Sequence, residues 1–187
     1  PSAISLKSFG QQEEHDAREM TAEEIEQTIR DFGEATRRAI EAGFDGVEIH
    51  GANHYLIHQF VSPYYNRRND VWADNYKFPV AVIDEVVKAK KAHAYDDFII
   101  GYRLSPEEAE SPGISMEITE ELIHQIANKP LDYIHVSLMD VNSVTREGKY
   151  KGENRLELIH QWINGRMPLI GLGSVFTAED ALNAVEN

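Results

Sequence analysis

The chain has 187 residues, 42% of them hydrophobic, and its 18 basic residues are outnumbered by 32 acidic ones, so its net charge is -14. This acidity argues against nucleic acid or an anionic membrane as a partner, and no apolar run approaches the ~20 residues of a membrane span. Because the sequence has no cysteine, it can form neither a disulfide nor a cysteine-anchored iron–sulfur cluster. We expect a cytoplasmic protein whose residues 1–187 form a single domain.

The N-terminal part predicts a loop followed by one long helix. Residues 1–19 show little hydrophobic periodicity and are expected to be loop. Thr21 is the expected N-cap of the helix, and Glu24 stands three residues later as the partner of a capping box. Apolar residues then recur at helical spacing until Gly43, where the helix is expected to end.

Four short apolar segments after this helix predict buried strands, and helical segments alternate with them. The strands are expected near 46–50, 98–103, 132–137 and 168–172, and the helices at 78–92, 118–127, 156–163 and 177–185. Such alternation is typical of right-handed βαβ units around a parallel sheet. The sequence therefore predicts an α/β fold of about four parallel strands with helices on the outer face.

Polar side chains gather where the first predicted strand ends. His50, Asn53 and Tyr55 follow the apolar segment 46–49 and lead into a further helix. The carboxyl ends of parallel strands are where such folds bind ligands. Two donors three residues apart can converge on one oxygen, and a nearby phenol can supply a proton. Helix capping and aromatic packing are the simpler alternatives for these residues.

The segment from Gly43 to Asp70 closely resembles a signature of the Old Yellow Enzyme family. It reads GFDGVEIHGANHYLIHQFVSPYYNRRND, and the family pattern at the fourth barrel strand is roughly VEIH-x-A-[HN]-x-YL-x-x-[QE]F followed by SP-x-x-N-x-R-x-D. The resemblance implies a (β/α)8-barrel ene-reductase that binds FMN, takes hydride from NADH or NADPH and reduces unsaturated carbonyl compounds. It also implies that His50 and Asn53 bind the substrate carbonyl and that Tyr55 donates the proton.

The same resemblance implies cofactor-binding roles, which His50 is expected to share. Arg103 ends the strand IIGYR and precedes Leu-Ser-Pro, a context in which the family places an arginine at the flavin N1/O2 edge. Gly173 and Ser174 follow the last predicted strand, in the loop with which the family holds part of the FMN phosphate. A salt-bridging arginine and a plain strand-to-helix turn are the alternatives.

The chain is too short for a complete barrel, which has eight strands and typically ~250 residues. Its match to the family covers the fourth to seventh strands, so the first three and the eighth are missing. We therefore interpret it as an internal fragment, a half-barrel that by itself binds FMN weakly or not at all and is inactive. Its two exposed sheet edges would be covered in a homo-oligomer.

The sequence departs from the family pattern at His54, where a glycine is usual, and at residues 71–77. His50, His54 and His58 recur every fourth residue and would share one side of a helix. Because no cysteine, matching carboxylate or HExxH pattern accompanies them, we expect no metal site. Two alternatives to a flavoenzyme stay open. One is a cofactor-free half-barrel, and the other is a different barrel enzyme that uses the histidine row as metal ligands.

Overall fold

The structure is a computed structural model that describes residues 1–4, 17–93 and 97–186, so most of the loop expected at 1–19 lies outside the described residues. The elements are α1 (Ala22–Glu41), β1 (Gly46–Gly51), α2 (Leu56–Val61), α3 (Lys77–His93), β2 (Ile99–Leu104), α4 (Met116–Ile126), β3 (Tyr133–Ser137), α5 (Arg155–Ile163), β4 (Leu169–Leu172) and α6 (Ala178–Glu186). Each predicted strand and helix is confirmed, and the boundaries move by at most about two residues, as is usual for helix and strand ends.

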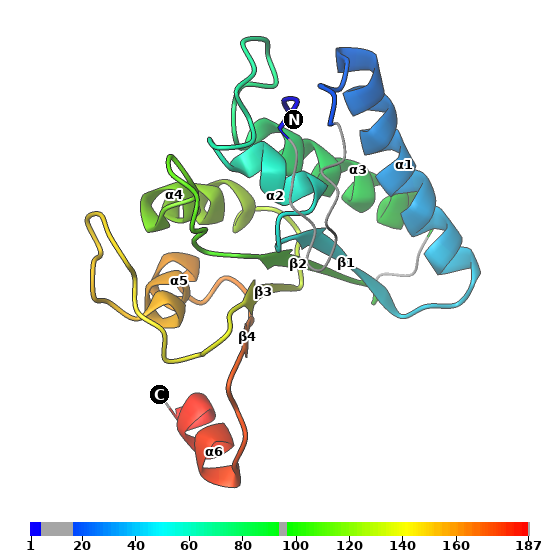
Figure 1. The fold of residues 1–187 in the computed structure, drawn as a ribbon. Helices are drawn as coiled ribbons and strands as arrows, with labels where there is room; N and C mark the ends of the chain where they lie inside the picture. The colour runs from blue at the N-terminus through cyan, green and yellow to red at the C-terminus, as the bar shows by residue number, and fades with distance from the viewer. Residues whose placement is uncertain (5–16, 94–96, 187) are drawn as a thin grey trace.

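The four strands form one parallel sheet in the order β1-β2-β3-β4, and most of the helices lie along one of its faces (Figure 1). A sequential order of parallel strands is what a run of right-handed βαβ units produces. Since the described strands do not close on themselves, β1 and β4 are the edges of the sheet. The expected half-barrel, with four parallel strands and outer helices, is confirmed.

The two faces of the sheet differ in chemistry. Ile49, Tyr102 and Ile134 are at most 3% exposed and form part of the core under the helices. The alternate positions, among them His50 and Arg103, point to the opposite face, here called the inner face. The inner face therefore carries polar and charged side chains where the outer face is apolar.

Gly101 on β2 allows polar side chains of β1 and β3 to meet across the inner face. Tyr133 is its register partner on β3, and a Cβ at residue 101 would overlap the Tyr133 ring. With no side chain in the way, the Tyr133 hydroxyl donates to Glu48 Oε2 on β1 at 3.0 Å. His135 Nδ1 lies 2.9 Å from the same carboxylate oxygen. These contacts tie β1 to β3 directly beneath the carboxyl edge of the sheet.

The segment 71–77, which diverges from the family pattern, is anchored in the core. Trp72 is 6% exposed, and its carbonyl accepts a hydrogen bond from Asn66 Nδ2 at 2.9 Å. Asn75 Nδ2 donates to the Val61 carbonyl at the end of α2, at 2.6 Å. The segment thus holds α2 against the start of α3.

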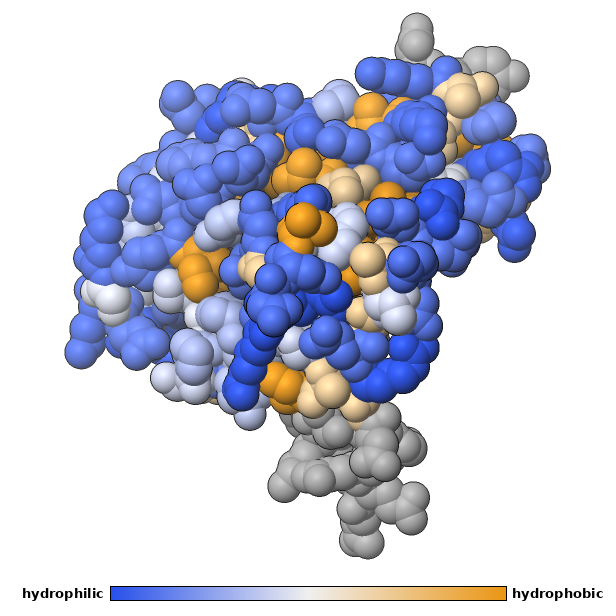
Figure 2. Space-filling view, turned by 90° about the horizontal axis from the view of Figure 1, so that it is seen from above, coloured by the Kyte–Doolittle hydropathy of each residue, from blue (hydrophilic) through white to orange (hydrophobic). Residues whose placement is uncertain are grey.

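The surface reflects the composition of the chain. On the face shown in Figure 2, hydrophilic residues predominate and apolar ones form small, separate groups. None of the described helices is long and apolar enough to cross a membrane.

The first helix begins with the predicted capping box. Thr21 Oγ1 accepts from Glu24 N at 3.2 Å, and Glu24 Oε2 accepts from Thr21 N at 2.9 Å. Two of the amide groups that a helix start leaves without intrahelical partners are thereby satisfied. Helix α1 then packs along α3, which it covers from the outside (Figure 1).

Replacing the cap should weaken the fold measurably. In Thr21→Ala the Glu24 amide loses its acceptor, so the free energy of unfolding should fall by about 1 kcal/mol in urea denaturation. Thr21→Ser keeps a hydroxyl at the cap and should remain close to the parent chain. An equal loss of stability in both variants would show that the hydroxyl does not cap α1.

Candidate functional site

The carboxyl ends of the strands bring together residues that lie far apart in the sequence. His50 on β1 is the register partner of Arg103 on β2, which is in turn the partner of His135 on β3. His50 lies within β1, one residue before its end at Gly51, so the strand extends two residues beyond the apolar segment 46–49. Since register partners point to the same face, the His50 imidazole and the Arg103 guanidinium are neighbours on the inner face.

Arg103 is a half-buried cation with no ion pair among the described residues. Its Nη2 donates to Ser137 Oγ at 2.8 Å, and its Nε is buried without a hydrogen-bond partner. Buried charges are normally paired, so an unpaired guanidinium marks a place where an anionic group can bind. In the described part of the chain no carboxylate forms a salt bridge with Arg103, so the alternative role as a salt-bridging arginine is not observed there.

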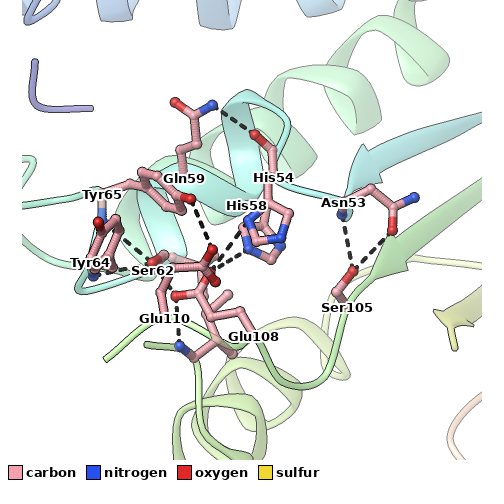
Figure 3. A network of polar contacts seen from close by, with 12 residues as sticks. Asn53, His54, His58, Gln59, Ser62, Tyr64, Tyr65, Ser105, Glu108 and Glu110 are labelled. Atoms are coloured by element: carbon pink, nitrogen blue, oxygen red, sulfur yellow. Dashed lines mark hydrogen bonds and ion pairs between the residues drawn. The ribbon is translucent and has the colours of Figure 1, made fainter. Parts of the chain in front are cut away.

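Asn53 is held by hydroxyl groups from two neighbouring strand ends. Its Oδ1 accepts from Ser105 Oγ at 3.3 Å and from Ser137 Oγ at 3.2 Å. Its backbone N donates to Ser105 Oγ at 3.0 Å (Figure 3). With the amide oxygen engaged, Nδ2 is left to donate to a ligand, and it points away from Ser105 in Figure 3. Ser137 also accepts from Arg103, so one hydroxyl connects the two predicted binding residues.

Sequence reasoning did not single out either serine. Ser105 belongs to the Arg-Leu-Ser-Pro context, so a motif signal was present there. Ser137 ends β3 with no motif around it, and its position at a strand end was the one available clue. Both are separated from Asn53 by more than fifty residues, 52 and 84 respectively.

His50 and Tyr55 approach each other across the turn after β1. Their ring centroids are 5.1 Å apart, with the ring planes at 58°. Tyr55 is the N-cap residue of α2, but its side chain makes no capping hydrogen bond and is 64% exposed. Burial and, to a lesser extent, the charge of Arg103 lower the pKa of His50, so the imidazole is neutral at pH 7. A neutral imidazole can donate one hydrogen bond to a carbonyl oxygen.

The turn between β1 and α2 has an uncommon backbone. Asn53 and His54 have φ values of 56° and 59°, in the left-handed region that most residues other than glycine avoid. Glycine adopts this conformation without strain, which agrees with the glycine that the family resemblance implies at the position of His54. The imidazole of His54 packs against the rings of His58 and Tyr65, with centroids 4.6 Å and 5.8 Å away.

His54 and His58 converge with Glu108, a carboxylate from the loop after β2 (Figure 3). Glu108 Oε2 lies 2.7 Å from His58 Nε2 and 3.8 Å from His54 Nδ1. Glu108 Oε1 accepts from Ser62 Oγ and, at 2.8 Å, from Ile114 N. Burial alone would raise the pKa of Glu108, but hydrogen bonds from His58 and Ser62 more than offset it, and the pKa lies below its ordinary value.

Gly173 and Ser174 join the loop after β4 to the loop after β3. Gly173 has a φ of 134°, and a Cβ there would lie 2.6 Å from Met139 C and 2.7 Å from Asp140 N. Ser174 Oγ donates to the Met139 carbonyl at 2.7 Å, and Val141 N donates to the Gly173 carbonyl at 3.4 Å. The two loops are therefore in backbone contact at the edge that carries Arg103, while their phosphate-binding role stays a prediction.

An open pocket of about 1350 Å³ adjoins this edge, and Asn53 and Tyr55 line it. His50, Arg103 and Gly173 are not among its lining residues. The remaining lining comes from α2 and the segments on either side of it, from the end of β3, from the loops after β2 and β3, and from the start of α5: His54, Leu56, His58, Gln59, Tyr64, Tyr65, Ser105, Pro106, Glu107, Glu110, Ser137, Leu138, Met139, Asp140, Ser143, Arg146 and Arg155. The pocket and the inner face of the sheet thus meet at Asn53.

The fold and the polar carboxyl edge define a partial (β/α)-barrel of the kind that binds ligands at strand ends. The model of the NADH:flavin oxidoreductase / NADH oxidase family matches residues 1–187, and the chain belongs to that family. It is 52% identical to the probable NADH-dependent flavin oxidoreductase YqiG of Bacillus subtilis (strain 168), over 91% of this chain and 47% of that protein. It is 45% identical to the NADH:acrylate oxidoreductase of Vibrio harveyi, over 90% of this chain and 17% of that protein.

A solved structure gives the same fold. The Old Yellow Enzyme homologue from Zymomonas mobilis superposes with a TM-score of 0.76 at 21% identity, covering 100% of this chain and 53% of that one. The family match and the relatives confirm the resemblance to the Old Yellow Enzyme family, and this structure confirms the fold. The chain spans about half the length of YqiG and of this structural neighbour, as a half-barrel should.

Membership in the family implies a flavin cofactor, FMN, with NADH as the electron donor. The residues present at the carboxyl edge fit such a group. The unpaired Arg103 guanidinium, with its buried Nε lacking a partner, suits the anionic N1/O2 edge of a flavin.

Adding a methyl group at Gly173 should separate the two loops. In Gly173→Ala the new Cβ meets backbone atoms of the loop after β3, which cannot rotate away. We expect amide exchange of Val141, which donates to the Gly173 carbonyl, to become roughly 10-fold faster or more in hydrogen-exchange measurements.

Gly165→Ala is the matched control, because Gly165 also has a positive φ, 69°, but a Cβ there has no atom within 4 Å. It introduces backbone strain without the collision and should leave exchange at Val141 unchanged. Unaltered exchange in Gly173→Ala would contradict the close contact of the two loops.

Proposed function

We propose that the protein containing this chain is an FMN-dependent oxidoreductase that reduces activated C=C bonds of α,β-unsaturated carbonyl compounds with NADH. The supporting observation is the register of β1 and β2, which pairs His50 with Arg103 on one face. A candidate carbonyl-binding group is thereby adjacent to a candidate flavin-binding group. The name of the relative from Vibrio harveyi, which refers to acrylate, also favours an activated alkene as substrate.

In this proposal the residues at the carboxyl edge would hold FMN, which would supply hydride chemistry for the β-carbon of the alkene. Arg103 supplies a fixed positive charge for the flavin pyrimidine edge. Gly173 and Ser174 contribute backbone amides toward the phosphate, in a loop where glycine allows close approach. His50 lies beside Arg103 and is expected to contact both flavin and substrate.

His50 and Asn53 bind the substrate carbonyl oxygen in this proposal and stabilise the negative charge that develops on it. The neutral His50 imidazole offers one N–H, and Asn53 Nδ2 offers another because Ser105 and Ser137 occupy its oxygen. Donors held in place before the reaction stabilise such a charge more effectively than water, which must reorient.

Tyr55 delivers the proton to the α-carbon. Its ring lies against His50, and its hydroxyl has no hydrogen bond to any described residue, so it is free to reach a substrate. A phenol positioned in this way is a competent general acid for an enolate carbon.

A cytoplasmic location and a homo-oligomeric assembly stay predictions from the sequence.

An absorbance spectrum of the full-length protein tests the cofactor. Bound flavin gives near-ultraviolet and blue bands, which NADH should bleach and an unsaturated ketone should restore. A cofactor-free protein or a metal-dependent hydrolase would show neither band. The isolated 187-residue polypeptide is the comparison, and we expect it to bind FMN only weakly.

Removing the Tyr55 hydroxyl should affect one half-reaction only. In Tyr55→Phe the ring is kept and the acidic proton is lost, so reduction of the flavin by NADH should be nearly unchanged in stopped-flow traces. Reoxidation by an unsaturated ketone should slow by ~10²–10⁴-fold, because carbon protonation loses its general acid.

Tyr64→Phe is the matched control, since Tyr64 lines the same pocket without a proposed role in the chemistry, and it should leave both half-reactions unchanged. If Tyr55→Phe slowed flavin reduction but left alkene turnover intact, Tyr55 would not be the proton donor.

Removing the His50 imidazole should weaken the stabilisation of the carbonyl oxygen. His50→Ala deletes one donor, so turnover of the unsaturated ketone should fall by ~10²–10³-fold, as for an oxyanion-hole donor. His124→Ala, at an exposed position on α4, should retain full turnover. Unaltered turnover in His50→Ala would remove His50 from the carbonyl-binding pair.

A further inference from the structure

We propose that His54, His58 and Glu108 form a binding site for a divalent transition-metal ion of the zinc type. Each of the three side chains offers one ligand atom, and these atoms all lie within 4.8 Å of one another. Ligand atoms around a tetrahedral zinc ion lie about 3.3 Å apart when the bonds are about 2.0–2.1 Å. The present separations of 2.7 Å and 3.8 Å between Glu108 Oε2 and the two imidazoles lie on either side of that value.

The cluster has more ligand capacity than its hydrogen bonds use. His54 Nδ1, which faces Glu108 Oε2, is buried and lacks a hydrogen-bond partner among the described residues. The same holds for Oε2 of Glu110, a second carboxylate lining the adjoining pocket. A buried polar atom without a partner is costly unless a ligand compensates for it. A cation bound by Glu108 Oε2 would satisfy His54 Nδ1, and His58, which is 1% exposed, faces the same carboxylate oxygen through Nε2.

The carboxylate is oriented as metal ligands usually are. Glu108 Oε1 accepts hydrogen bonds from Ser62 Oγ and Ile114 N, which leaves Oε2 directed at the two imidazoles (Figure 3). Hydrogen bonds to the other oxygen of a carboxylate fix the direction of the ligand oxygen before the ion arrives.

The nature of the ligands selects the metal. Two imidazoles and one carboxylate are a common set for zinc, whereas calcium and magnesium prefer oxygen ligands throughout. The carboxylate is the element that sequence reasoning lacked, because Glu108 is 50 residues from His58. His50, the first member of the histidine row, is not part of the cluster.

Such an ion would join three segments: the turn after β1, helix α2 and the loop after β2. His54 lies between Asn53 and Tyr55, so an ion held by its side chain would fix the turn that presents both residues. We therefore assign the ion a positioning role that does not depend on the identity of the flavin or of the substrate. The backbone of His54 is in the left-handed region, which is unfavourable for a residue other than glycine. A histidine at this position therefore indicates a function for its side chain.

Calorimetric titration of the full-length protein with ZnCl2, after treatment with EDTA and removal of the chelator, tests the site. We expect one equivalent of zinc to bind at micromolar affinity or tighter and to raise the melting temperature. In His54→Gly the affinity should fall by at least about 100-fold, since loss of a direct ligand exceeds the 10–100-fold cost of losing a second-shell partner. This variant should fold, because glycine readily adopts the φ of 59° found there.

Glu108→Gln keeps the shape of the side chain but removes its charge, and it should weaken zinc binding to a similar extent. His124→Ala is the matched control, because His124 is an exposed helical histidine outside the cluster. It should bind zinc as the parent protein does. Absence of zinc binding, or unchanged affinity in a folded His54→Gly, would overturn the proposal and leave the cluster as a hydrogen-bonded packing feature.

Discussion

The parallel register of β1, β2 and β3 is the constraint on which the whole carboxyl edge depends. It makes His50, Arg103 and His135 neighbours on one face. A slip of one residue between β1 and β2 would turn His50 to the opposite face from Arg103 and move apolar core residues to the inner face. The core under the helices therefore fixes the relative positions of polar side chains with which it has no contact. The hydrogen bond from Tyr133 to Glu48, which requires glycine at position 101, holds the same register from the inner side.

The regular elements were predictable from the sequence because the signals that specify them are local. The capping residues Thr21 and Glu24 stand three positions apart, and each strand is a short apolar run bounded by helical periodicity. The positions of Arg103 and Gly173 at strand ends followed from the same pattern. Their chemical roles did not, and were inferred from a family resemblance that the family comparison then confirmed at the level of the fold and the family.

What the sequence did not reveal are contacts between distant loops. Ser137 donates a hydrogen bond to Asn53, which is 84 residues away in the sequence, and no pattern around either residue predicts this contact. The histidine row illustrates a related point. Its spacing would place the three histidines on one side only within a helix, but of the three only His58 lies in α2, and His54 precedes that helix in a left-handed turn. The carboxylate that completes the cluster with His54 and His58 arrives from the loop after β2.

The hydrogen bonds that hold Asn53 also determine when, during synthesis of the chain, the arrangement around this residue can be completed. The ribosome delivers β1 and its turn first, then Ser105 and only later Ser137, at separations of 52 and 84 residues from Asn53. A nascent chain that ends before β3 contains Ser105 but lacks Ser137, so Asn53 Oδ1 has only one of its two hydroxyl partners. The proposed ligand-binding arrangement around Asn53 can therefore be complete only after the third strand has been synthesised, although His50, Asn53, Tyr55 and Arg103 emerge earlier.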